Sequence, residues 1–317
     1  DANTEGNYNS AFGYNSLGAN TTGTHNTALG DYSQAANTTG TKNVSVGQGS
    51  FISNTTGDNN TVVGTEALDQ NTTADNNTAV GFQSLKANTT GTFNTAVGNN
   101  AGDAITTGGR NIAIGSSALT SDTVGSRAVA IGYEALATQN FTSATDNYNI
   151  GIGFQAGYAV TTGVQNTFIG GLAGDATTTA NNNTAVGYFS LSANTTGTAN
   201  TAVGQNSLLT NTTASNNTAI GRFSLRLNTT GANNTAVGYE ALDKNTTAAN
   251  NTAVGMQAMQ GNTTGANNVA IGQAALAGNT TAANNTAIGY ASLAANTTGT
   301  GNVAVGHDAF KTNTTGG

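Results

Sequence analysis

The sequence predicts an all-β protein built as a parallel β-solenoid, in which the chain winds into stacked coils. Three observations carry this prediction. A glycine recurs at intervals of 17 residues, eighteen times in all, from Gly13 to Gly306. Fixed residue types recur at fixed positions around each glycine. The segments between turn-forming residues span roughly four to six residues, which is the length of a short strand and too short for paired helices.

The composition argues against an ordinary globular enzyme. Only 7% of the residues are charged, 43 are glycine, and proline, cysteine and tryptophan do not occur. The net charge of −7 is too small to keep the chain unfolded by repulsion. The eight basic residues are scattered, so nucleic acid is not an expected partner. No apolar stretch approaches the roughly 18 residues of a membrane-spanning helix, and we expect a protein that does not span a membrane.

A typical repeat runs from Asn234 to Asn250. We number positions within a repeat from its glycine, here Gly238. Position −4 is Asn in seventeen of the eighteen repeats, with Ala128 as the exception, which predicts a ladder of stacked asparagines. Asn234 and Gly238 are therefore expected to be structural.

Three further positions of this repeat are expected to be structural. Position −1 is aliphatic in all repeats but the first, as in Val237. Position +3 is always Ala or Ser, as in Ala241, which indicates a steric limit. Position +4 is commonly Leu, as in Leu242.

The repeats predict one continuous solenoid array over residues 1–317. A single interval, from Gly132 to Gly153, is 21 residues long, which places a four-residue insertion within about residues 139–146. The Asn-Thr-Thr-Gly and Gly-x-x-Asn-Asn stretches supply the corners of the coil, because Gly and Asn tolerate left-handed backbone conformations.

Linked substitutions indicate a shared interior pocket. Where position +4 is Gly102, Gly157 or Gly174, position +7 changes from Asn to Ile105, Val160 or Thr177. We infer that the side chains at +4 and +7 fill the same space from two sides, which avoids a cavity.

Alternation along the strand separates two faces. Val at −1 shares a face with the Thr or Val at −3, while Ala at −2 points the other way. We expect Val and Leu to fill the coil and the Ala face to pack between copies, since a lone thin coil buries little apolar surface. A homotrimer is the expected assembly, and end-to-end filaments remain an alternative.

A family resemblance supports this assembly. Segments 111–118 (NIAIGSSA), 127–137 (RAVAIGYEALA) and 268–275 (NVAIGQAA) resemble the head repeat of YadA-type trimeric autotransporter adhesins. That resemblance implies a left-handed parallel β-roll trimer and an adhesive role, although the 17-residue coils here are longer than the family's. The repeats also resemble those of phage tail-fibre and other virion appendage proteins. Both resemblances imply an extracellular, cell-surface or virion location for the protein.

Exposed aromatic residues are the candidate recognition residues. Position +1 is often aromatic, and these residues suit stacking on sugars or contact with a cell-surface or glycan receptor; partial burial in a subunit groove is the alternative. The insertion offers a second recognition site at Phe141, unless it is a tolerated bulge. The candidates at position +1 are Tyr133, Phe154, Tyr188, Tyr239 and Tyr290.

No residue pattern predicts catalysis, a metal site or a cofactor. His25 and His307 lie at opposite ends of the array, and the many hydroxyls have no neighbouring base. The thirteen Asn-Thr-Thr triplets are formal glycosylation acceptors but are explained more simply as repeated turns. Their paired Thr columns leave a monomeric ice-binding solenoid as the alternative to a fibre, although adjacent residues on a strand point in opposite directions.

Overall fold

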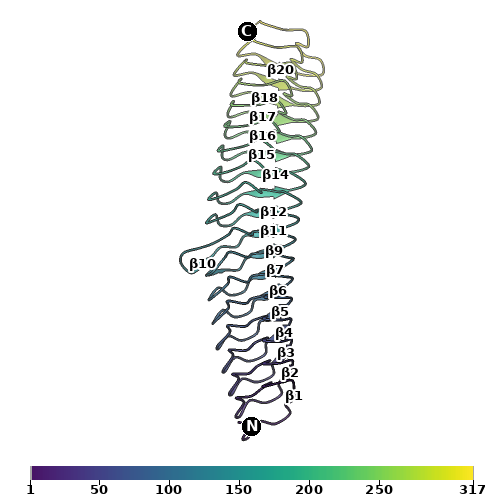
Figure 1. Cartoon of the computed structure of the whole chain (residues 1–317). Helices are drawn as coiled ribbons and strands as arrows, with labels where there is room; N and C mark the ends of the chain where they lie inside the picture. The colour runs from purple at the N-terminus through teal and green to yellow at the C-terminus, as the bar shows by residue number, and fades with distance from the viewer. Residues whose placement is uncertain (1, 317) are drawn as a thin grey trace. The chain divides into compact units, whose positions relative to one another are not determined.

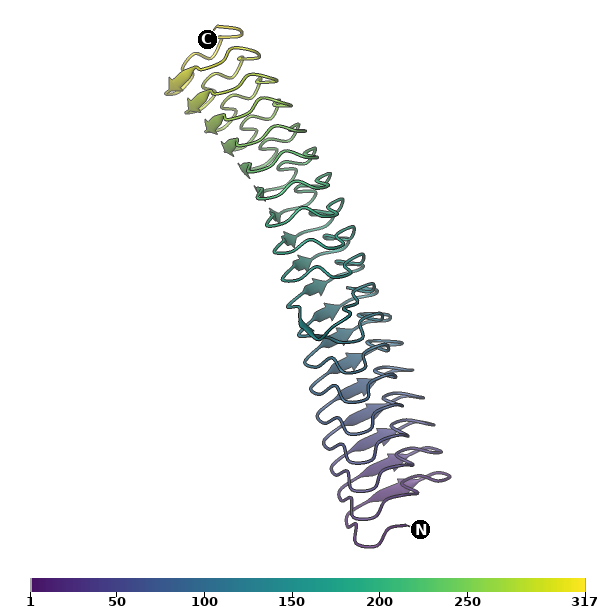
Figure 2. The same cartoon turned by 90° about the vertical axis from the view of Figure 1, so that its left-hand side faces the viewer.

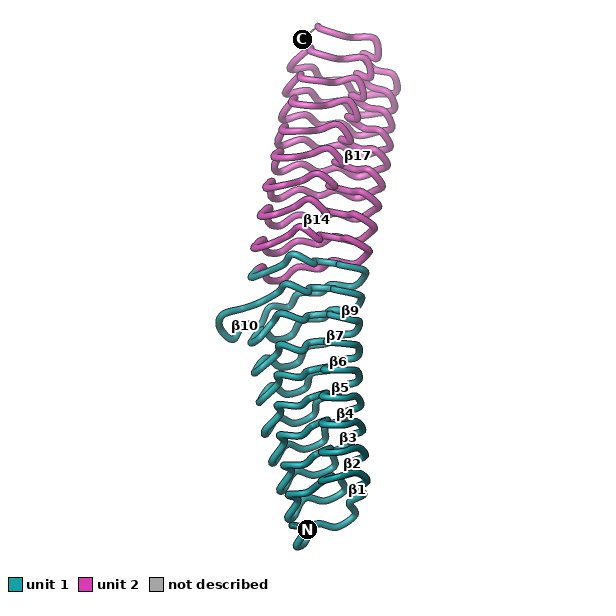
Figure 3. The backbone as a smooth tube through the Cα atoms, in the orientation of Figure 1, with its two compact units in different colours: residues 1–162 teal, residues 163–317 magenta. Residues whose placement is uncertain are grey.

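The computed structural model describes residues 2–316 and divides into two compact units, residues 1–162 and 163–317 (Figure 3). Each unit is a parallel β-solenoid in which every coil contributes a three-residue strand; the first unit adds two strands of two residues, and the described residues contain no helix. The fold class predicted from the repeats is thus confirmed.

The strands of the first unit (Figure 1) are β1 (Ser10–Phe12), β2 (Thr27–Leu29), β3 (Val44–Val46), β4 (Thr61–Val63), β5 (Thr78–Val80), β6 (Thr95–Val97), β7 (Ile112–Ile114), β8 (Gly125–Ser126), β9 (Val129–Ile131), β10 (Thr145–Asp146) and β11 (Ile150–Ile152). Those of the second unit are β12 (Thr167–Ile169), β13 (Thr184–Val186), β14 (Thr201–Val203), β15 (Thr218–Ile220), β16 (Thr235–Val237), β17 (Thr252–Val254), β18 (Val269–Ile271), β19 (Thr286–Ile288) and β20 (Val303–Val305).

Within each unit, strands of successive coils lie side by side and pair in register (Figure 2). In β16 and β17, Thr235 lies opposite Thr252 and Val237 opposite Val254. Hydrogen bonds between coils continue outside the strands: the Leu242 amide donates to the Ala258 carbonyl at 3.0 Å, and the Thr246 amide donates to the Thr263 carbonyl at 3.0 Å. Because of these bonds, successive coils stay paired although each strand has only three residues.

The repeat glycine is required by close approach between coils. Gly238 has a φ of 137°, and a β-carbon there would lie 2.5 Å from the carbonyl oxygen of Gly255. Both the backbone conformation and the space exclude any side chain. Glycine is therefore fixed at this position by geometry, as the repeat predicted.

The interior of the coil is filled by small residues opposite one large residue. Ala236 at −2, Ala241 at +3 and Leu242 at +4 are fully buried. Positions −2 and +4 face each other: a β-carbon at Gly174, a +4 position, would lie 2.4 Å from the Phe168 ring at −2.

This packing corrects the predicted orientation of the strand. Val237 was expected inside the coil and the Ala face between copies. Instead, Ala236 faces the interior and Val237 lies partly exposed on the outside. The reason is steric, because the +4 Leu occupies the interior in front of the strand and limits the space at −2, which Ala fills in most repeats and Val62 in one.

Two asparagine ladders run through the coils, of which the sequence predicted one. At −4, Asn234 Nδ2 donates to the Ala248 carbonyl at 2.9 Å, and its Oδ1 accepts the Asn251 amide at 3.0 Å. At +7, Asn245 Nδ2 donates to Asn228 Oδ1 at 2.8 Å and to the same Ala248 carbonyl at 3.0 Å. The Asn of the Asn-Thr-Thr triplet is therefore a core residue as well as a turn residue.

The shared pocket at +4 and +7 is present in the first unit. Ile105 is buried, and a β-carbon on Gly102 would lie 3.0 Å from its Cδ1. Ile at position +7 interrupts the +7 asparagine ladder. Asn88, one coil earlier, has a buried Oδ1 without a hydrogen-bond partner, because Ile105 offers no amide.

Candidate functional site

The outer sheet face is an exposed surface that continues along the strands of each unit. We use this name for the side chains at −3 and −1 of the sheet strands, such as Thr252 and Val254. Aliphatic side chains at −1 remain substantially exposed, as in Ile220 (40%), Ile271 (40%) and Ile288 (37%). No charged residue occupies either position in any repeat. A sheet face of this kind is uncharged, apolar along one column and mostly hydroxyl-bearing along the other.

The threonines of this face form a regular array. Thr218, Thr235 and Thr252 are in register on adjacent strands. Adjacent coils lie about 4.8 Å apart, and positions −3 and −1 about 6.7 Å apart, by standard strand geometry. The Thr columns of the Asn-Thr-Thr triplet behave differently: the Thr246 hydroxyl donates to the Thr263 carbonyl at 3.0 Å, whereas Thr247 is exposed.

The predicted aromatic recognition residues are exposed, but they do not form one site. Tyr133 and Phe154 stack with ring centroids 5.6 Å apart and planes 11° apart. Tyr188 packs against Phe189, its neighbour in sequence, in an edge arrangement. The exposed fractions are 48% for Tyr133, 52% for Phe154, 52% for Tyr188, 39% for Tyr239 and 46% for Tyr290.

Phe141 is not a surface residue. It was predicted to carry recognition on the insertion, but it is only 5% exposed. The chain does leave the regular coil here, and β10 pairs with β8 in a separate two-stranded sheet (Figure 1). Phe141 is held at the base of this excursion by its amide, which donates to Asp122 Oδ1 at 3.4 Å.

The insertion repairs both asparagine ladders. Ala128 has no side-chain oxygen to accept the Asn149 amide, and Asn147 Oδ1 accepts it instead at 2.9 Å. In the second ladder, Asp122 Oδ2 accepts Gln139 Nε2 at 2.7 Å, and Gln139 Oε1 accepts Asn149 Nδ2 at 2.8 Å. Burial raises the pKa of the Asp122 carboxyl, an effect that its hydrogen bonds with Gln139 and backbone amides oppose.

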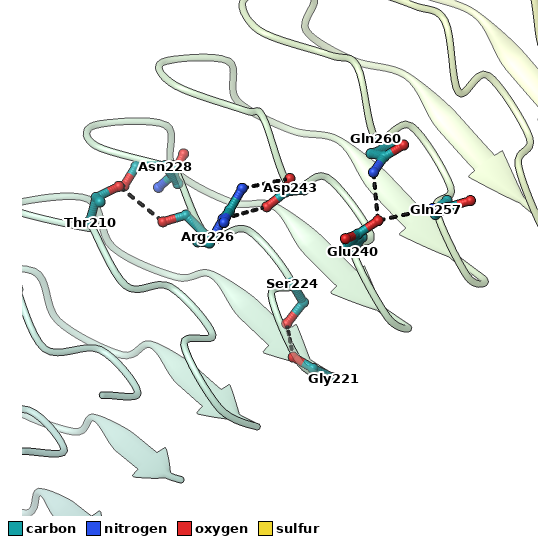
Figure 4. A network of polar contacts seen from close by, with 9 residues as sticks. All are labelled: Thr210, Gly221, Ser224, Arg226, Asn228, Glu240, Asp243, Gln257 and Gln260. Atoms are coloured by element: carbon teal, nitrogen blue, oxygen red, sulfur yellow. Dashed lines mark hydrogen bonds and ion pairs between the residues drawn. The ribbon is translucent and has the colours of Figure 1, made fainter. Parts of the chain in front are cut away.

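A polar and aromatic cluster in the second unit was missed by the sequence analysis. We call it the Glu240 cluster; its residues are Arg222, Phe223, Arg226, Tyr239, Glu240, Asp243, Gln257 and Gln260 (Figure 4 shows Arg226, Glu240, Asp243, Gln257 and Gln260). Gln257 Nε2 and Gln260 Nε2 both donate to Glu240 Oε2, at 3.0 and 2.6 Å. Arg226 makes two hydrogen bonds to Asp243, at 2.8 and 3.1 Å.

Arginine, aromatic ring and carboxylates are fixed relative to one another in this cluster. The guanidinium carbons of Arg222 and Arg226 lie 4.3 and 4.9 Å from the centroid of the Phe223 ring. The hydrogen bond from Gln257 lowers the pKa of the Glu240 carboxyl, with smaller contributions from Tyr239 and the arginines. Burial raises the pKa of Asp243 despite Arg226. A usable signal was present in the sequence, since Glu240 and Gln257 occupy the same position +2 in adjacent coils.

The described residues contain no group of three or more His, Cys, Asp or Glu placed to hold a metal ion. The structure of residues 2–316 also has no helix of the length and apolarity that a membrane span requires.

Of the thirteen Asn-Thr-Thr triplets, twelve have a buried Asn; only Asn313 is partly exposed. A glycan could reach the buried twelve only before the coils form.

Comparison with known proteins adds no assignment to these features: no protein-family model matches the chain, and no curated protein matches it significantly.

Proposed function

We propose that this chain is a structural fibre element, a shaft or head segment of an extracellular adhesin or phage-type tail fibre that mediates attachment to a surface. The observation that carries the proposal is the outer sheet face. An apolar column that continues through coil after coil is a surface that soluble monomers rarely expose, and such patches mark interaction sites.

Other copies of the same chain are the partner that fits this face. The columns repeat with the period of the coil, so a second copy presents aliphatic residues with the same spacing. The absence of charge removes the desolvation penalty that ion-bearing faces incur on burial. The homotrimer follows from the resemblance to YadA-type head repeats, and closed cyclic symmetry satisfies every copy equally.

The solution mass tests the fibre proposal. Light scattering on a size-exclusion column is expected to give about three times the 31.3 kDa chain mass. Replacing Val203 and Val237 with Lys places charges on the outer sheet face and should dissociate the oligomer. Thr213→Lys with Thr247→Lys adds the same charge at exposed positions away from that face and should leave the mass unchanged.

A monomeric wild-type protein would contradict the proposal. So would an oligomer that persists equally in both Lys variants, since its interface would then lie elsewhere.

The register of the Thr column favours ice binding as a second candidate. The hydroxyls of Thr218, Thr235 and Thr252 stand in line beside an aliphatic column on the same uncharged face. The paired Thr columns of the Asn-Thr-Thr triplet are not the relevant surface, because their first hydroxyl is bonded to the next coil. A monomer with thermal hysteresis that Thr235→Lys abolishes would favour this function over the fibre.

A further inference from the structure

Two places in the molecule carry the same arrangement of an exposed tyrosine, a glutamate and a glutamine. In the first unit, Gln155 Nε2 donates to Glu134 Oε2 at 2.7 Å beside Tyr133. In the second unit, Gln257 Nε2 donates to Glu240 Oε2 at 3.0 Å beside Tyr239. In both, Tyr is at +1, Glu at +2, and Gln at +2 of the next coil.

Each tyrosine is also adjacent to its glutamate in the chain. A side-chain hydrogen bond with Glu134 raises the pKa of the Tyr133 hydroxyl, and one with Glu240 does the same for Tyr239. The glutamine amide is held on the carboxylate by the hydrogen bond to it, and the ring stands beside this pair at each place. Preorganised groups lose little conformational entropy when they bind a ligand.

A second ring lies next to each tyrosine. Phe154 stacks parallel to Tyr133 at 5.6 Å, and Phe223 lies 6.3 Å from Tyr239. These rings are not needed by the coil itself. Position +1, where Phe154 lies, is also Gln or Ser in other repeats, as in Gln205 and Ser116, and position +2, where Phe223 lies, is also Asn or Ala, as in Asn206 and Ala274. At Glu66 the same Glu–Gln pair occurs beside Thr65, so the pairing links coils on its own and the ring is an addition to it.

The chemistry of the group matches a sugar ring. A pyranose offers an apolar C–H face that packs on an exposed aromatic ring, together with hydroxyls that both donate and accept hydrogen bonds. The glutamine amide uses one N–H on the glutamate, and an amide has a second N–H and a carbonyl oxygen to offer; the carboxylate accepts through its remaining lone pairs. Since a carboxylate is present at both places, it repels acidic sugars and favours neutral ones.

We propose that the Tyr239–Glu240–Gln257 group, and its counterpart Tyr133–Glu134–Gln155, bind neutral pyranose sugars through ring stacking and hydrogen bonds to the carboxylate and amide. The inference rests on the attachment role proposed above and specifies its ligand class. In the second unit, Arg226 is held by Asp243, and Gln260 Nε2 also donates to Glu240 Oε2, which extends the polar border of the site (Figure 4).

Saturation-transfer NMR tests the sugar sites. The probes are methyl α-D-glucopyranoside, methyl β-D-galactopyranoside, methyl α-D-mannopyranoside and N-acetylglucosamine at millimolar concentration. At least one probe is expected to receive saturation from the wild-type protein. The double variant Tyr133→Ala/Tyr239→Ala should weaken its binding at least tenfold, and Gln155→Ala/Gln257→Ala should weaken it measurably.

Tyr188→Ala is the matched control, because Tyr188 is an exposed ring at the same position whose next residue is Phe189 instead of Glu. This variant should bind the probe as the wild type does. Failure of all four probes to receive saturation would overturn the inference, and so would an equal loss in the Tyr188 control. The solution mass of each variant separates this result from the fibre proposal, since sugar binding can fail while the oligomer persists.

Discussion

Asparagine side chains supply the hydrogen bonds that water would otherwise make to backbone groups in the interior. The coils are thin, so some polar backbone groups lie inside them. In each regular repeat, two amides converge on one carbonyl, as Asn234 and Asn245 do on the Ala248 oxygen. Both asparagines are fully buried, so their hydrogen bonds form in a poorly solvated interior where an unpaired partner is costly. Asn recurs at these two positions because its side chain both donates to a carbonyl and accepts an amide.

Asn234→Ala should destabilise the second unit by about 1–3 kcal/mol, because the buried Asn251 amide loses its acceptor. Native-state hydrogen exchange should show faster exchange at that amide than in the wild type. Thr247→Ala is the control, since Thr247 is exposed, and its effect should stay within about 0.5 kcal/mol. Unchanged exchange at Asn251 would show that the ladder is not structural.

The pocket shared by Gly102 and Ile105 gives a second prediction at this scale. Ile105→Ala should cost about 2–5 kcal/mol, because Gly102 has no side chain to fill the cavity. Gly102→Leu alone should also destabilise, since the new side chain meets Ile105 Cδ1. The double variant Gly102→Leu/Ile105→Asn restores the common pair and should recover most of the loss. Denaturant unfolding of Gly102→Leu, Ile105→Asn and the double variant measures this coupling, and strictly additive losses would exclude a shared pocket.

The strand and the corner differ in how far the sequence determines them. Strand position and register follow from the 17-residue columns, because the repeat glycine, the −4 Asn and the +4 Leu keep fixed spacings in the coil. Alternation alone separated the two faces of the strand but did not reveal which one was interior. That choice depends on the +4 Leu, whose buried side chain limits the space at the opposite position, which Ala fills in most repeats.

The sequence predicted candidate sites that consist of a single exposed residue, but not sites that several coils build together. Exposed rings such as Tyr239 could be identified from position +1. The Glu240 cluster depends on partners 17 and 20 residues away, at Gln257 and Gln260, which meet only once the coil length is applied to pairs of positions. Phe141 was misplaced because nothing in the sequence of an insertion shows which of its residues turns inward.

At the insertion, Asp122→Asn should change the pH dependence of stability. Burial raises the pKa of Asp122 in the folded chain, so the folded state holds this proton more tightly than the unfolded state does. Its contribution to the free energy of unfolding therefore falls as the pH rises from about 4, the ordinary carboxyl value, to the raised pKa, and is constant above it.

The Asp122→Asn variant has no titrating group at this position, so it should gain stability relative to the wild type across that window and keep the advantage at neutral pH. Urea unfolding of both proteins between about pH 3 and 8 measures the difference, and all other titrating groups cancel. Parallel curves for the two proteins would mean that Asp122 has its ordinary pKa when folded.

Across the molecule, each coil is stabilised mainly by its two neighbours, which makes the phase of the repeat more important than the number of coils. Deleting residues 268–284 removes one full repeat and joins Asn267 to Asn285. Asn251 Oδ1, which now accepts the Asn268 amide, would accept the equivalent Asn285 amide. The glycine, asparagine and strand columns all stay in phase. The loss of stability should therefore be limited to the contribution of one repeat and its contact with one neighbour.

Deleting Ala270 alone should be more damaging than deleting all 17 residues. The shortened β18 would turn Val269 or Ile271 into the interior in place of Ala270, against the fully buried Leu276, and would move the other side chains of the strand to the wrong face. Far-ultraviolet circular dichroism and urea unfolding should show a midpoint close to the wild type for the 17-residue deletion and a clearly lower one for the single deletion. The reverse order would mean that the coils do not depend on register, because a change that preserves phase would then cost more than one that breaks it.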